Sequence, residues 1–152
     1  FTDIQGHWAA DFITGLARQN FIGGFEDGSF RPDIPINRAQ YASLVVNAFN
    51  PTARRTAITF SDIPANFWAK PFIDRAYQAG FISGFPDGSF KPGQNILRLQ
   101  VLASLVTGLD LTGANLNALA AYDDRNTIPQ YAQNQVSIAT INRLVVNFPN
   151  LR

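Results

Sequence analysis

Two arginines, Arg38 and Arg98, stand sixty residues apart in the same local pattern, and each falls in the first turn of a predicted helix. A cation at that place opposes the helix macrodipole, so stability alone would favour an acidic residue there. A bound anion removes the conflict, because free backbone N–H groups and a bidentate guanidinium both suit a carboxylate. The pattern therefore predicts that each arginine holds an acidic ligand. The alternative is pairing with a nearby aspartate, such as Asp3 or Asp62.

The two tryptophans of the chain, Trp8 and Trp68, also occupy equivalent positions. An indole face can lie against the C–H surface of a sugar while the ring N–H donates a hydrogen bond. The competing interpretation is core packing at the start of a helix. We expect both roles, with core packing dominant, and Tyr131 takes the corresponding place in a third copy.

Smaller residues of the same repeating pattern are candidates for the site as well. Asp3 and Asp62 can accept from sugar hydroxyls, or they can cap local backbone N–H groups, and the sequence leaves both open. Gly24 and Gly84 allow a positive φ or a close ligand approach, with the turn interpretation favoured. Lys91 follows the loop, where it adds positive charge beside the site or is solvated surface.

Metal and cofactor chemistry find no support in the pattern. His7 is the one histidine and Phe67 replaces it in the second copy, so a structural role is expected. Asp27 and Asp87 lie in loops that lack the alternating acidic ligands of a calcium site and are interpreted as turn residues. We therefore expect no metal and no cofactor.

The chain is built from repeats, because residues 21–32 recur almost unchanged as 81–92 and a degenerate third copy begins at Tyr122. A unit of this size cannot bury its apolar face alone, so the copies must share a core. The predicted organisation is one domain over 1–152, with repeats 1–50, 60–109 and 121–152 (the third incomplete) and linkers 51–59 and 110–120.

Apolar residues recur at helical spacing in each copy, which predicts five substantial helices. Their apolar stripes cover 9–16, 41–49, 69–76, 101–109 and 136–140, and a short helix is expected over 114–121. Asn37 can cap the second helix with Gln40 three residues on. Leu97, its counterpart, carries no acceptor, so the fourth helix begins less firmly or recruits Asn95. Asp-Gly pairs between the helices predict tight turns, with room for two very short strands.

Composition excludes several classes of function. The net charge of +1 gives no electrostatic footprint for nucleic acid or an anionic membrane surface. There is no cysteine, which excludes disulfides and fits an exported bacterial protein. No apolar run approaches the roughly 18 residues that span a bilayer, so no direct membrane insertion is expected.

Taken together, these motifs resemble the surface-layer homology (SLH) family. The first match is the run Gly6-His7-Trp8-Ala9, and the second is Gly84-Phe85-Pro86-Asp87-Gly88-Ser89-Phe90-Lys91-Pro92. The tetrapeptides at 37–40 and 97–100 stand where the family has Thr-Arg-Ala-Glu. Gln40 and Gln100 stand where the family motif has Glu, and these substitutions resemble cyanobacterial members of the family. The sequence of residues 144–150 resembles those members as well.

The resemblance implies an all-α fold of tandem helix-loop-helix repeats, arranged as a pseudo-three-fold helical spindle around a central bundle of first helices. It implies a non-catalytic anchor that binds secondary cell-wall polysaccharide linked to peptidoglycan, often through a pyruvate ketal, in grooves between repeats. The implied setting is the cell envelope, in the periplasm or on the cell surface. The ligand-binding residues assigned on this basis are Arg38, Arg98, Trp8, Trp68, Asp3, Asp62, Gly24, Gly84 and Lys91.

Two other function classes stay open. A wall-active glycosidase needs two carboxylates about 5–10 Å apart, and Glu26 is the only glutamate of the chain. A structural oligomerisation module needs only helix faces, and packing alone would not demand repeated loops, arginines and tryptophans. Because Phe1 opens directly on a motif, we interpret the chain as a piece of a larger envelope protein whose remainder lies C-terminal.

Overall fold

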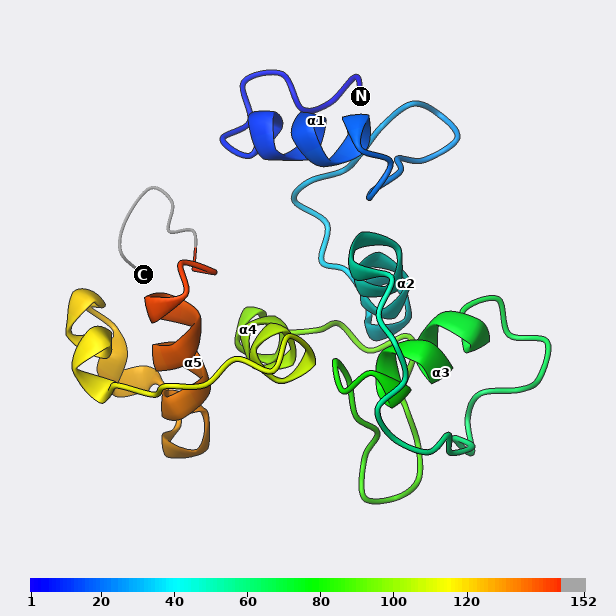
Figure 1. Ribbon diagram of the computed structural model, residues 1–152. Helices are drawn as coiled ribbons and strands as arrows, with labels where there is room; N and C mark the ends of the chain where they lie inside the picture. The colour runs from blue at the N-terminus through cyan, green and yellow to red at the C-terminus, as the bar shows by residue number, and fades with distance from the viewer. Residues whose placement is uncertain (146–152) are drawn as a thin grey trace.

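The computed structural model describes residues 1–145, and within them the regular structure is helical. Its elements are α1 (Ala10–Arg18), α2 (Arg38–Phe49), α3 (Lys70–Gln78), α4 (Arg98–Gly108), the 3₁₀ helices η1 (Leu116–Ala121) and η2 (Arg125–Thr127), and α5 (Gln130–Ile141) (Figure 1). In these residues the short strands reduce to one isolated bridge between Asn37 and Asn95. The all-α prediction is confirmed, and η1 lies within the predicted 114–121 segment.

Helix beginnings follow the local sequence. Asn37 accepts from the backbone N–H of Gln40, and the Gln40 side chain accepts from that of Asn37, which completes the predicted capping box. Before α4 only half of this box forms, where Gln100 accepts from Leu97 N at 3.0 Å. Leu97 remains the N-cap of α4 without a side-chain cap, and the backbone of Asn95 forms the bridge with Asn37.

The closest helix packing joins consecutive repeats. Helix α2 of the first repeat packs against α3 of the second, and α4 packs in the same way against α5 of the third. Tyr41 and Val45 of α2 share one buried cluster with Ile73 of α3 and with Phe90 of the following loop. Within residues 1–145 the first helices α1, α3 and α5 do not pack extensively on one another. The expected central bundle of first helices is therefore replaced by pairs of second and first helices, because the apolar stripes of α3 and α5 face the preceding repeat.

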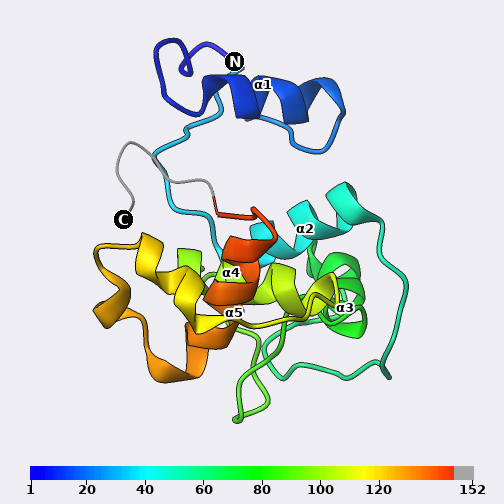
Figure 2. The ribbon, with the colours of Figure 1, turned by 60° about the vertical axis from the view of Figure 1, so that its left-hand side comes forward.

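The first half of repeat 1 stands apart from the other helices. Figures 1 and 2 show α1 on one side of a group formed by α2 to α5, joined to it by the extended segment before α2. Ile4 and Ile13 are buried there, whereas Phe12 and Leu16 of α1 are 54% and 40% exposed. The apolar face of α1 is therefore left largely uncovered by the other described helices.

The first linker fastens helix ends together. Arg54 donates to the carbonyl of Ala79 just after α3, at 3.0 Å from Nε, and to that of Gly108 at the end of α4, at 2.5 Å from Nη2. Arg55 donates to the carbonyls of Tyr77 and Ile82 and lies over the Tyr77 ring. The last carbonyls of a helix lack intrahelical partners and carry partial negative charge. The Arg54 guanidinium thus binds the C-terminal ends of both α3 and α4.

Replacing Arg54 with Ala is expected to lower the free energy of unfolding by about 2 kcal/mol, because charge-assisted hydrogen bonds to two helix ends are lost. Urea unfolding followed by circular dichroism measures this change. Arg18→Ala, at the exposed end of α1, is the matched control and should change stability by less than about 0.5 kcal/mol. Equal effects of the two substitutions would contradict the role assigned to Arg54.

Candidate functional site

The aspartates before the first helices bind the loop of their own repeat. The Asp3 carboxylate accepts from the backbone N–H groups of Phe30 at 2.8 Å and Arg31 at 2.6 Å. Asp62 accepts from Phe90 and Lys91 in the same way, both at 2.7 Å. The hydrogen bond from Phe30 lowers the pKa of Asp3 below its usual value. Of the two alternatives for these aspartates, the structure therefore places them as caps of local backbone.

The two loop glycines are required by packing against an aromatic ring. A Cβ at Gly24 would overlap the Phe1 ring and the Ser29 carbonyl, and a Cβ at Gly84 would overlap Phe60 in the equivalent place. Neither glycine has a positive φ. Their close approach is to the chain's own ring, although Gly24 also lines a groove between the first two repeats.

The basic residues that follow each loop are neutralised within it. The Arg31 guanidinium lies 2.7 Å from Asp27 and over the Phe25 ring at 4.0 Å. Lys91 lies 3.5 Å from Asp87 and above the equivalent phenylalanine ring. Both aspartates also accept from the serine two residues on, as the turn interpretation predicts. Lys91 is thus a loop-stabilising residue. It lines neither of the two hollows described below, the cavity beside Arg98 and the groove beside Trp68.

Arg38 does not lie in an open groove. Its side chain is 5% exposed and enters the loop of the second repeat, where Nε donates to the Phe90 carbonyl at 2.8 Å and Nη2 to that of Ser83 at 2.6 Å. The Phe85 and Phe90 rings flank the guanidinium, and burial lowers the pKa of Arg38, with the nearby Asp62 charge opposing that shift.

The backbone N–H groups at the start of α2 are also occupied. Arg38 N donates to the Gln94 carbonyl at 2.9 Å and Ala39 N to the Pro92 carbonyl at 3.1 Å. The prediction that this helix start presents free donors and a cation to an acidic ligand is wrong. Loop carbonyls of the next repeat satisfy both, so Arg38 joins two repeats, and it forms no ion pair with a carboxylate of residues 1–145.

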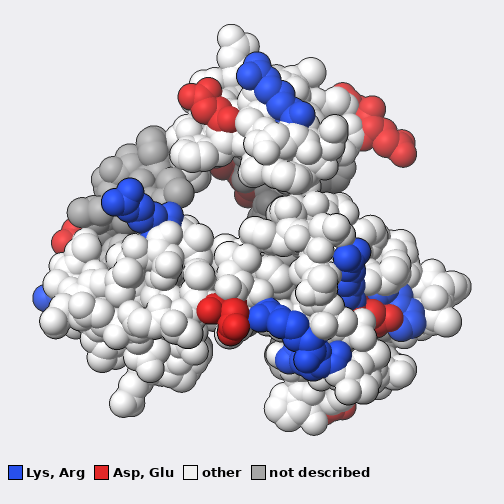
Figure 3. All heavy atoms as spheres, in the orientation of Figure 1, with Lys and Arg blue, Asp and Glu red and all other residues white. Residues whose placement is uncertain are grey.

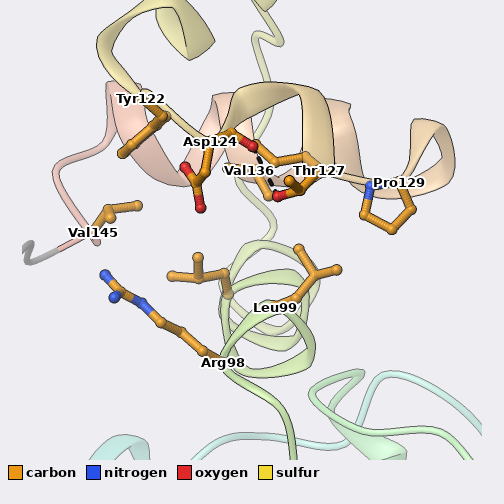
Figure 4. Close-up of a pocket in the computed structure, with 10 residues that line it drawn as sticks. Arg98, Leu99, Tyr122, Asp124, Thr127, Pro129, Val136 and Val145 are labelled. Carbon is orange, nitrogen blue, oxygen red and sulfur yellow. Dashed lines mark hydrogen bonds between the residues drawn. The ribbon is translucent and has the colours of Figure 1, made fainter. Parts of the chain in front are cut away.

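Arg98 has a different setting, at the junction of the second and third repeats. It is exposed and lines a cavity of about 240 Å³ between α4 and the segment leading into α5. Figure 4 shows Arg98 and Asp124 on facing sides, with Leu99, Tyr122 and Val136 forming much of the wall. A guanidinium beside a mainly apolar cavity can meet an acidic group carried on an apolar body.

A larger groove lies between the first and second repeats, and we call it the repeat 1–2 groove. It has a volume of about 720 Å³, within the usual range for ligand sites. Its walls are formed by loop residues 21–25, 30–32 and 34–36 and by Trp68 of the second repeat. The side of α2 adds its N-cap Asn37 and the residues Gln40, Ser43, Leu44 and Asn47. The sequence predicted an inter-repeat groove, and the structure brings Gly24 and Trp68 together in this one.

The tryptophans are exposed, contrary to the expected dominance of core packing. Trp8 is 48% exposed and Trp68 is 57% exposed. Trp68 lines the repeat 1–2 groove and its equivalent Trp8 does not. The ring of Trp68 is held beside Phe67 and Phe72, at centroid distances of 5.9 and 6.5 Å. An exposed ring fixed by neighbouring aromatic rings can receive a flat ligand at little entropic cost.

The polar wall of the groove was not among the predicted site residues. It consists of Asn37, Gln40, Ser43 and Asn47, which recur every three or four residues along α2. That spacing places them on one helix face. The signal was present in the sequence as this spacing, and α4 has Leu97, Gln100, Ala103 and Thr107 at the same places, so only the glutamine is shared by the two helices.

Metal and membrane features are absent from the described part of the chain. Within residues 1–145 no three side chains of the metal-binding types approach closely enough to hold an ion. The lone His7 instead accepts from Ala9 N and lies 3.3 Å from Asp33. No helix among these residues is both long and apolar enough to cross a bilayer. Basic and acidic side chains are interspersed over the face in Figure 3.

Comparisons with known proteins agree on one family. The model of the S-layer homology domain matches residues 1–42 and 59–102. A cellulosome-anchoring protein of Acetivibrio thermocellus is 33% identical over 76% of this chain and 28% of its own length. A surface-layer 125 kDa protein of Lysinibacillus sphaericus is 26% identical over 95% of this chain and 12% of its own length. An amylopullulanase of Thermoanaerobacterium thermosulfurigenes is 28% identical over 99% of this chain, which spans only 8% of that enzyme.

Proposed function

The chain belongs to the S-layer homology family of cell-wall anchoring modules, and we propose that it binds wall polysaccharide linked to peptidoglycan. The observation that carries this proposal is the repeat 1–2 groove, where the exposed Trp68 ring faces a wall of polar side chains. A pyranose ring presents C–H patches and hydroxyl groups, and such a groove matches both.

The pyruvate ketal of the polymer is assigned to the other junction. Arg98 lines the cavity between the second and third repeats, and Arg38 lines neither this cavity nor the repeat 1–2 groove. A ketal carries a carboxylate and a methyl group on one carbon, and this cavity offers the Arg98 cation and apolar walls, with the Asp124 carboxylate on the facing side. We propose that Arg98 is the residue that contacts the acidic substituent.

The proposed role is non-catalytic. No carboxylate lines the repeat 1–2 groove among the described residues, so the acid and base pair of a glycosidase has no counterpart there. The amylopullulanase is matched over a small share of its length, so this chain resembles only a small part of that enzyme. We propose that the chain is one domain of a larger, exported envelope protein of cyanobacterial type, and that it holds that protein at the wall.

Co-sedimentation with purified cell walls tests the function. The chain should be retained on walls that carry the native polymer, and chemical removal of the ketal should weaken retention about fivefold or more through loss of a charged hydrogen bond. Arg98→Ala should weaken retention on native walls by a similar factor and have no further effect on de-pyruvylated walls. Arg18→Ala, a surface arginine on α1, is the control.

The outcomes separate the parts of the proposal. A chain that stays in the supernatant with both kinds of wall would contradict carbohydrate anchoring as a whole. Retention that is unchanged both by removal of the ketal and by Arg98→Ala would contradict only the proposal that Arg98 contacts the acidic substituent. Release of reducing sugar during incubation would favour a glycosidase instead.

A further inference from the structure

The described residues of the repeat 1–2 groove carry no uncompensated charge. Among residues 1–145, Arg31 is the one charged residue that lines it, and its Nη2 donates to Asp27 at 2.7 Å while its Nε donates to Ser29 at 3.1 Å. Hydrogen bonds from Ser29, followed by the contact with Arg31, lower the pKa of Asp27 to about 2. The aspartate therefore stays ionised at neutral pH, and the pair contributes no net charge to the groove.

The polar wall offers neutral donors in fixed orientations. The side-chain oxygens of Asn37 and Gln40 are both occupied, because each accepts from the backbone N–H of the other at 2.9 Å. These contacts fix which amide atom is oxygen, so the groups that remain on these two groove-lining residues are NH₂ donors. No residue of the described part of the chain accepts from them. Ser43 accepts weakly from Asn47 Nδ2 at 3.5 Å, which leaves its hydroxyl hydrogen and the Asn47 carbonyl for a ligand.

We infer that the repeat 1–2 groove selects an uncharged stretch of polysaccharide, which the amide groups of α2 hold while Trp68 supports its C–H face. The inference rests on the proposed function and names the ligand chemistry of its main site. Amide NH₂ groups donate to hydroxyl and acetamido oxygens, and Asn47 accepts from a hydroxyl. A carboxylate in the same place loses hydration and finds no free cation in return. The two junctions are thus unequal, with neutral sugars bound at the first and an acidic substituent at the second.

Trp68 fluorescence tests this inference in the whole chain. With Trp8→Phe as background, Trp68 is the remaining indole and its emission reports on the groove. The probes are oligosaccharide fragments of the wall polymer with the ketal removed, and the same fragments with the ketal present. We expect a saturable change with the de-pyruvylated fragments, and an affinity that varies less than about twofold between 50 and 500 mM salt, as for an uncharged contact.

Gln40→Glu is the decisive variant. A glutamate at this position keeps the capping box, since its carboxylate still accepts from Asn37 N, but it removes the amide donors from the groove. The affinity for de-pyruvylated fragments should fall about fivefold or more, the usual effect of one lost hydrogen bond. Gln100→Glu makes the same change at the start of α4, outside the groove, and should leave the affinity unchanged.

Other results would overturn the inference. A Trp68 response only to fragments with the ketal, or an affinity that falls steeply with salt, would show a charged contact in the groove. Equal affinities for the Gln40→Glu and Gln100→Glu chains would show that the amide wall does not bind sugar. If the chain is still retained on walls in these cases, the anchoring function stands and only the neutral site fails.

Discussion

Replacing Arg38 with Ala is expected to lower the free energy of unfolding by about 3–5 kcal/mol. Two loop carbonyls of the second repeat, those of Ser83 and Phe90, lose a charged donor in a buried place. The rings of Phe85 and Phe90 also lose the guanidinium that lies between them. Arg38→Lys should be intermediate, because a single ammonium group cannot reproduce the planar fork that joins the two carbonyls.

Denaturant unfolding measures the global effect, and amide hydrogen exchange locates it. Exchange should accelerate most in residues 82–92 and at Ala39, whose backbone N–H donates across the same junction. Arg18→Ala is the control, because it removes an exposed arginine from α1. If Arg38→Ala kept full stability and lost only wall binding, the buried arginine would be a ligand contact rather than a tie between two repeats.

Local features of the fold could be predicted from the sequence. The capping box of Asn37 and Gln40, the half box before α4 and the number of helices depend on residues within one turn of each other. The turn role of Asp27 and Asp87 likewise follows from contacts two to four residues away. Propensity and capping act over these short distances, so a single repeat contains the necessary information.

The roles of Arg38 and Arg54 depend on contacts that a repeat pattern does not specify. Arg38 binds carbonyls 45 and 52 residues further along the chain, and Arg54 binds one 54 residues away. Both arginines donate to backbone carbonyls. Every residue has such a carbonyl, so the amino-acid sequence does not indicate which carbonyls these arginines bind. For the same reason the sequence did not show that second helices pair with the first helices of the following repeat.

In the candidate site, too, local features could be predicted from the sequence and long-range contacts could not. The repeated position of the tryptophans was visible, but nothing local indicated that Trp68 and not Trp8 lines the repeat 1–2 groove, because the other walls of that groove come from the loop and second helix of the previous repeat. Trp8 has no preceding repeat among residues 1–145, so equivalent positions acquire different surroundings. Equivalence between repeats therefore predicts backbone conformation better than it predicts ligand contacts.

Trp68→Ala is expected to lower wall affinity about 30-fold, the effect of removing about 2 kcal/mol of contact from a central aromatic residue. The ring is 57% exposed, so its loss should change the melting temperature little. Trp8→Ala is the matched control, since it deletes the equivalent ring outside the groove.

Co-sedimentation at several wall concentrations gives the affinities, and circular dichroism confirms that both variants keep their helices. Trp68→Phe should retain part of the affinity, because a smaller ring still offers a face to the sugar but no indole N–H. Equal losses in the Trp8 and Trp68 variants would mean that binding does not depend on the repeat 1–2 groove. In that case the cavity at Arg98 would have to carry the anchoring by itself, and retention would then depend strongly on salt.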